Sequence, residues 1–140
     1  MKGDTRGPAG AKGNGWSIED ALDLYQIPAW GQGYFSINAA GHLVVRPDTT
    51  PQHEIDLHEV VAGLAERDLT APLVIRFSDI LKHRLQRLHD AFAQAIAENE
   101  YQNRYAAVFP IKVNQQRLVV EEVFRYGKPH GFGLEVGSKP

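Results

Sequence analysis

The chain has 140 residues, 15 basic and 17 acidic side chains, and a formal net charge of −2. This length fits one ordinary domain, and the near-neutral charge does not favour binding to nucleic acid or to an anionic membrane. Cysteine is absent, which excludes disulfides, thiolate metal sites and thiol nucleophiles. The chain lacks the run of roughly 20 apolar residues that spans a bilayer and shows no secretory leader, so we expect a cytoplasmic protein.

The first half of the chain predicts a tail, a short helix and a β-hairpin. Residues 1–15 are rich in glycine and poor in large apolar side chains, which is typical of a disordered tail. Order is expected from Trp16, because Ser17 and Asp20 have the spacing of a helix cap, and Pro28 is expected to end this helix. Two strands, residues 34–37 and 42–46, are expected to pair through the turn-forming residues between them.

The second half predicts alternating helices and strands. Apolar spacing favours helices over residues 55–65 and from Ser78 or Asp79, where one of these two side chains would cap the helix. Three apolar runs predict strands over residues 73–77, 105–113 and 131–136. A helix is predicted over residues 116–126, between the last two of these strands. Strand, helix and strand over about 30 residues predict a βαβ unit with parallel strands.

Lys112 is the strongest candidate for chemistry. It lies inside the apolar run over residues 105–113, which is typical of a parallel strand that is buried on both faces. A lysine inside such a strand would lose hydration of its ammonium group unless it lay at the strand end facing a cavity, and desolvation frees the amine to form an imine with a carbonyl compound. The alternative is that the strand ends at Ile111 and that Lys112 reaches solvent.

Two further polar residues accompany this lysine. In an extended chain Asn114 would project to the same side as Lys112 and could orient its amine, or it could form a turn at the strand end. Glu135, in the next strand, would need a partner such as Lys112 if buried, or would face water at a sheet edge. His53 and His58 are five residues apart and do not fit the metalloprotease spacing, so no metal site is predicted.

The segment VFPIKVNQQ at residues 108–116 resembles the lysine segment of the biosynthetic arginine decarboxylase family. Further blocks resemble that family in the same order along the chain. They are residues 16–21 (WSIEDA), Tyr25, residues 30–35 (WGQGYF), Gly41 and His42, residues 72–81 (PLVIRFSDIL), and residues 131–139 (GFGLEVGSK). The resemblance covers everything after the tail.

This resemblance implies an α/β fold, part of a (β/α)₈ barrel of the alanine racemase type. Residues 16–78 would contribute to the accompanying β-domain, and residues 79–140 would form the opening, incomplete part of the barrel. Pyridoxal 5′-phosphate would be the cofactor and Lys112 its Schiff-base lysine, with Asn114, Glu135 and Ser138 also placed near it. Barrel enzymes carry reactive groups at the carboxyl ends of their strands. The resemblance also allows Mg²⁺, for which the sequence shows no ligand set.

The implied reaction is decarboxylation of L-arginine to agmatine and carbon dioxide, a step of polyamine and spermidine biosynthesis, in a homo-oligomeric full-length enzyme. The chain is several times shorter than members of that family, so we expect a fragment without decarboxylase activity of its own. Two alternatives remain at this stage. One is a non-catalytic module that binds a partner through the helix over residues 81–96, and the other is a regulatory subunit that docks onto an intact decarboxylase.

Overall fold

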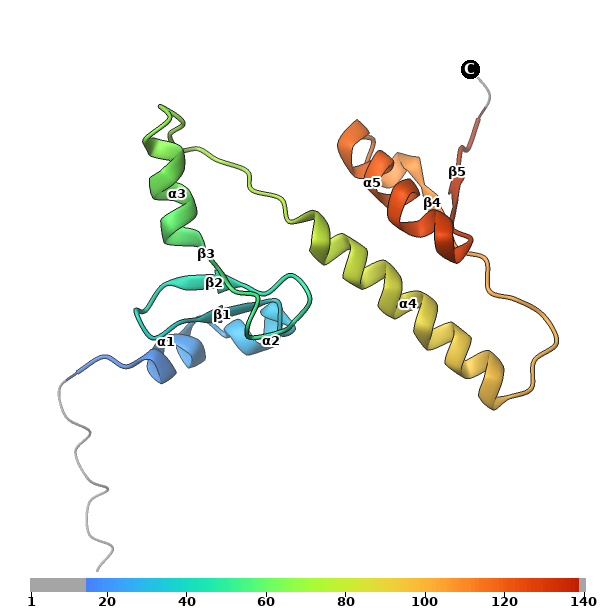
Figure 1. The fold of residues 1–140 in the computed structure, drawn as a ribbon, viewed down its shortest axis with the longest axis horizontal. Coiled ribbons are helices and arrows are strands. Elements are labelled where there is room, and N and C mark those ends of the chain that lie inside the picture. Colours follow the sequence, from blue (N-terminus) through green and yellow to red (C-terminus); the bar gives the residue numbers. More distant parts are fainter. Residues whose placement is uncertain (1–14, 139–140) are drawn as a thin grey trace, which may run out of the picture.

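A computed structural model describes residues 15–138 of the chain. Apart from Gly15, the predicted tail lies outside the described residues. The molecule has two parts, which we call the hairpin unit (residues 16–65) and the lysine unit (residues 78–138), joined by residues 66–77 (Figure 1). No helix of the described part is both long enough and apolar enough to cross a membrane.

The hairpin unit begins with two short helices, α1 (Ile18–Leu24) and α2 (Ile27–Gly31). The predicted cap is confirmed, because the Ser17 hydroxyl accepts a hydrogen bond from the Asp20 backbone and the Asp20 carboxylate accepts one from the Ser17 backbone. The expectation that Pro28 ends the first helix is wrong. Pro28 lies in the first turn of α2, where its missing N–H breaks no helical hydrogen bond.

The predicted hairpin is confirmed. Strands β1 (Phe35–Ile37) and β2 (Leu43–Val45) are antiparallel, and the Asn38 side chain accepts hydrogen bonds from two backbone N–H groups of the connecting turn. A third strand that the sequence did not indicate, β3 (Ile55–Asp56), pairs antiparallel with β2. The middle strand supplies the buried centre of this unit through Val44 and Val45.

Helix α3 (Leu57–Ala65) begins where the Asp56 carboxylate accepts hydrogen bonds from the backbone of His58 and Glu59. The strand predicted over residues 73–77 is wrong, since this segment has no regular secondary structure and leaves Val74 81% exposed. A strand needs a neighbour to satisfy its backbone groups, and no neighbouring strand lies beside this segment in the described residues.

The lysine unit begins with the long helix α4 (Ser78–Glu98), which starts where the sequence predicted. Neither Ser78 nor Asp79 caps it with a side-chain hydrogen bond, so that expectation is wrong. The Ser78 hydroxyl instead donates to the carboxylate of Glu122 on the next helix. Figure 1 shows that this next helix, α5 (Arg117–Gly127), lies along one side of α4.

The predicted βαβ unit is confirmed. Strands β4 (Val108–Pro110) and β5 (Gly133–Glu135) are parallel, with Phe109 opposite Leu134, and α5 connects them. Two short 3-10 helices complete the connection: η1 (Ile111–Val113) and η2 (Lys128–His130). The fold is therefore mixed α/β with one three-stranded and one two-stranded sheet, and no closed barrel is formed by the described residues. A partial barrel stays a prediction.

Candidate functional site

Lys112 lies just beyond the carboxyl end of a parallel strand. The predicted strand over residues 105–113 is shorter than expected, because β4 ends at Pro110 and the chain then turns through η1, with Lys112 in its middle. The side chain is exposed, so the desolvated lysine is wrong for this chain and the alternative, a lysine that reaches solvent, is confirmed. The amine is instead open to solvent and to any carbonyl compound that reaches it.

Asn114 stabilises the turn that follows the lysine. Its side-chain oxygen accepts a hydrogen bond of 3.0 Å from the backbone N–H of Gln116, just before α5 begins. Asn114 therefore forms a turn at the strand end, which is one of its two predicted roles. The expected alternation from Lys112 to Asn114 does not apply, since η1 is not an extended strand.

Glu135 ends the neighbouring strand. It lies opposite Pro110 in the parallel register and is half-buried, whereas Ser138 lies three residues further and is exposed. Within residues 15–138, no hydrogen bond or ion pair joins Lys112 to Asn114, Glu135 or Ser138. The topology thus brings Lys112 and Glu135 to the same end of one small sheet without direct pairing.

The backbone beside this sheet is held by close packing. Gly127 ends α5 against Phe132, and a Cβ atom at Gly127 would lie only 2.6 Å from the Phe132 Cβ. Val123 is buried in the same region, and the backbone N–H of Gly133 donates to the Ala107 carbonyl at 2.8 Å. These contacts hold the end of α5 and the start of β5 beside β4.

The first turn of α5 carries an ion pair. Arg117 donates a hydrogen bond of 2.6 Å to the carboxylate of Glu121 one turn later. This hydrogen bond, helped by the opposite charge, raises the pKa of the Arg117 guanidinium. Arg117 therefore remains a cation at every pH of interest, five residues after Lys112.

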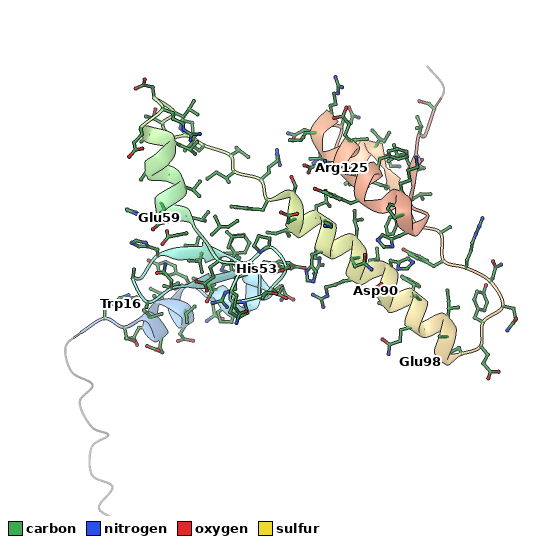
Figure 2. The ribbon with its side chains drawn as sticks, viewed as in Figure 1. Trp16, His53, Glu59, Asp90, Glu98 and Arg125 are labelled. Atoms are coloured by element: carbon green, nitrogen blue, oxygen red, sulfur yellow. The ribbon has the colours of Figure 1, made fainter. Side chains whose placement is uncertain are left out.

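A second feature, which the sequence did not indicate, is a cavity of about 520 Å³ between the hairpin unit and α4. Its polar lining includes Asp48, His53, Lys82 and His83, and Figure 2 shows His53 on the side of the hairpin unit that faces α4. Lys112 is not among the lining residues. The two walls are about 30 residues apart in the sequence, so no local pattern could have revealed this cavity.

The histidines do not assemble a metal site. His53 pairs with Asp48 at 2.7 Å, whereas His58 stacks on the ring of His42. No group of three or more histidine or carboxylate side chains in residues 15–138 could hold a metal ion. The described residues therefore do not fit the Mg²⁺ that the resemblance allows, and we derive no step through that ion.

The chain thus has an α/β fold. Its candidate reactive group, Lys112, follows the first strand of a parallel βαβ unit and lies at the carboxyl end of the sheet. Comparison with known proteins confirms the family resemblance. The sequence is 50% identical over 140 residues to biosynthetic arginine decarboxylase 1 of Synechocystis sp., covering 100% of this chain and 20% of that protein. The chain is thus homologous over its whole length to biosynthetic arginine decarboxylases.

Other cyanobacterial relatives give the same result. The biosynthetic arginine decarboxylase of Nostoc sp. is 54% identical over 125 residues, which cover 89% of this chain and 18% of that protein. That of Thermosynechococcus vestitus is 51% identical over 129 residues, covering 92% of this chain and 20% of the relative. No protein-family model matches the chain. The chain spans about one fifth of the length of these relatives.

Proposed function

We propose that this chain supplies the lysine-bearing part of a pyridoxal-phosphate-dependent arginine decarboxylase, with Lys112 as the residue that holds the cofactor. The observation that carries the proposal is the position of Lys112 directly after the first strand of a parallel βαβ unit, in a chain half identical to enzymes named arginine decarboxylases. L-Arginine is the substrate under this proposal, agmatine and carbon dioxide are the products, and the enzyme is cytoplasmic and homo-oligomeric.

The residues present fit the aldehyde of this cofactor. Lys112 is exposed, forms no ion pair with a carboxylate of residues 15–138, and lies at the sheet end where barrel enzymes place reactive groups. When bound, the cofactor supplies an electron sink for the electrons left by the departing carboxylate. The protein's part is to present the amine, orient the substrate and exclude water.

The neighbours of Lys112 have separate tasks under this proposal. Asn114 holds the turn that follows the lysine, through the hydrogen bond that its side-chain oxygen accepts from the Gln116 backbone. Glu135 places a carboxylate at the adjacent strand end, and Ser138 follows it with a hydroxyl that can donate to an anionic group. Under this proposal both residues contact the ligand that Lys112 holds.

Reductive labelling tests the proposal. The purified chain is mixed with an equal concentration of pyridoxal 5′-phosphate, reduced with borohydride and mapped by peptide mass analysis. We expect the label at Lys112, and we expect Lys112→Arg to abolish it. Lys128→Arg is the matched control, because Lys128 is also exposed but lies on η2, over the Phe124 ring. Label spread evenly over the surface lysines would contradict the proposal.

A second measurement separates cofactor capture from the complete reaction. A two-stranded sheet provides one edge of a site and does not surround a substrate. We therefore expect the 140-residue chain to release no agmatine from L-arginine and pyridoxal 5′-phosphate, even where Lys112 is labelled. Agmatine formation above the level given by free cofactor would overturn this expectation.

A further inference from the structure

The outer face of α4 is a candidate interface. Three contacts occupy the other faces of this helix. Ser78 forms a hydrogen bond with Glu122, and His83 forms one of 2.8 Å with the Tyr34 hydroxyl. The Phe92 ring stacks on the Tyr105 ring, with 3.8 Å between the ring centroids. The remaining side of α4 is lined by Arg84, Leu85, Arg87, Leu88 and Ala91 around a shallow groove of about 370 Å³. Leu88 is 41% exposed there.

Charge is distributed along this face in a self-complementary way. Arg84 lies seven residues before Ala91, and Glu98 lies seven residues after it. Seven residues are nearly two helical turns, so all three residues share one face, with about 10 Å along the axis between successive members. The face is therefore basic toward its start, small and apolar in its middle, and acidic at its end, where Figure 2 shows Glu98.

We infer that α4 pairs antiparallel with α4 of a second copy of this chain, about a two-fold axis that passes beside Ala91. This arrangement places Arg84 of each copy opposite Glu98 of the other, and it brings Leu88, Ala91 and Ala95 into a central apolar contact. An interface of this kind is self-complementary, as a two-fold dimer requires. The small side chain at Ala91 allows the two helix axes to approach closely.

The charged groups are available for this pairing. Within residues 15–138, neither Arg84 nor Arg87 takes part in an ion pair. Glu98 accepts a hydrogen bond from Gln94 at one carboxylate oxygen, which leaves its second oxygen for an arginine. The inference is independent of the role proposed for Lys112, since that residue lies at the sheet end and not on α4.

The contact is small. A helix of 21 residues is about 30 Å long, and one helix against another buries less than the area typical of tight complexes. We therefore expect a weak dimer, observed by sedimentation equilibrium at high protein concentration. Its two ion pairs are exposed and screened by salt, so association should weaken as the salt concentration rises.

Charge reversal provides the first test. Arg84→Glu places two glutamates opposite each other at both ends of the interface, and Glu98→Arg places two arginines there. We expect each single variant to weaken association by roughly tenfold or more and the double variant to restore it to within about threefold of the original. Lys82→Glu is the matched control on another face of the same helix, and it should leave association unchanged.

Disulfide trapping provides the second test, because the chain contains no cysteine of its own. Ala91→Cys should form a covalent dimer quickly on mild oxidation, since the two thiols meet at the axis. Ala97→Cys, also exposed but on another side of α4, should do so much more slowly. A chain that stays monomeric at every concentration, equal trapping rates for the two variants, or a double charge reversal that fails to restore association would overturn the inference.

Discussion

At the scale of single residues, the edge of the cavity holds the most strongly perturbed group of the described chain. The Asp48 carboxylate accepts a hydrogen bond of 2.7 Å from His53 and another of 2.9 Å from the Thr50 backbone. These bonds, led by the one from His53, lower the pKa of Asp48 from 3.8 to about 2. The segment between β2 and β3 is therefore held by an acid that stays ionised in mildly acidic solution.

The pKa of the Asp56 carboxyl group is also lowered by hydrogen bonds. Partial burial acts to raise the pKa of this carboxyl group, but hydrogen bonds from His42, Asn38 and two backbone N–H groups together lower it. Because one oxygen caps α3 and the other contacts the turn of the hairpin, a single carboxylate joins β3, α3 and the hairpin turn.

The low pKa of Asp48 predicts an acid-dependent loss of stability. The native carboxylate holds its proton less tightly than the unfolded one, so its stabilising contribution is complete above pH about 4 and is lost as the pH falls toward 2. The native chain should therefore unfold at a higher urea concentration than Asp48→Asn at pH 5, and this difference between the two urea midpoints should shrink as the pH falls from about 4 toward 2.

Carbon-detected titration of the Asp48 carboxyl checks the same prediction directly. The native chain should titrate near pH 2, and His53→Ala should move the midpoint toward 3.8, since it removes the principal hydrogen bond. A native midpoint that already lies at 3.8 would contradict this account.

At the scale of elements, the βαβ unit depends on the close approach of α5 to β5. Gly127 has no side chain, and this absence lets the Phe132 ring, which is 8% exposed, pack directly on the end of the helix. Gly131 then turns the chain with a φ of 75°, a left-handed value that glycine adopts readily. Two glycines within five positions thus determine how the second strand returns beside the first.

Substitution at Gly127 tests this packing. Gly127→Ala should lower the free energy of unfolding by about 1 to 3 kcal/mol, the range seen when extra atoms are forced into a packed region. Gly63→Ala is the matched control within α3, where an added Cβ meets nothing within 4 Å, and it should raise stability by up to about 1 kcal/mol. Thermal or urea unfolding of both variants measures the difference, and equal effects would show that Phe132 does not restrict Gly127.

Some of the helices and strands could be predicted from the sequence, and others could not. Local signals were sufficient for the hairpin, the cap at Ser17, α4 and the parallel βαβ unit, because turn residues and apolar spacing act within a few positions of one another. The ends of strands depend on partners far along the chain. Residues 73–77 have strand-like composition without a neighbouring strand, and β4 stops at Pro110, opposite the last residue of β5.

The candidate site was predictable only in part for the same reason. Lys112 and Glu135 do reach one end of one sheet, as parallel strands require. The exposure of Lys112 is the second of the two alternatives that the sequence left open, and the turn η1 decides between them, since the apolar run before it does not. Whether these residues hold a cofactor stays a prediction that reductive labelling tests.

At the scale of the whole molecule, two small cores are joined by a segment without regular structure. Tyr34, Val44 and Val45 are buried in the hairpin unit, and Val123 and Phe132 are buried in the lysine unit. A hydrogen bond between the Tyr34 hydroxyl and the His83 ring connects the two units. The segment over residues 66–77 therefore carries little of the packing.

This arrangement predicts where a protease cuts first. Arg67 and Arg76 lie in the joining segment, and both are exposed. Brief trypsin digestion should therefore cleave there before it cleaves at the arginines within α4, because exposed chain without helical hydrogen bonds enters a protease readily. Mass analysis of the first products provides the measurement, and early cleavage inside α4 would contradict the prediction.

The two tryptophans of the chain, Trp16 and Trp30, both belong to the hairpin unit. Trp30 donates a hydrogen bond of 2.9 Å to the Tyr25 carbonyl, and its ring lies 5.0 Å from that of Phe35. Indole emission therefore reports on the three antiparallel strands and their short helices. Far-ultraviolet circular dichroism comes from the helices of both units, of which α4 and α5 are the two longest, so indole emission follows one unit and circular dichroism follows the whole polypeptide.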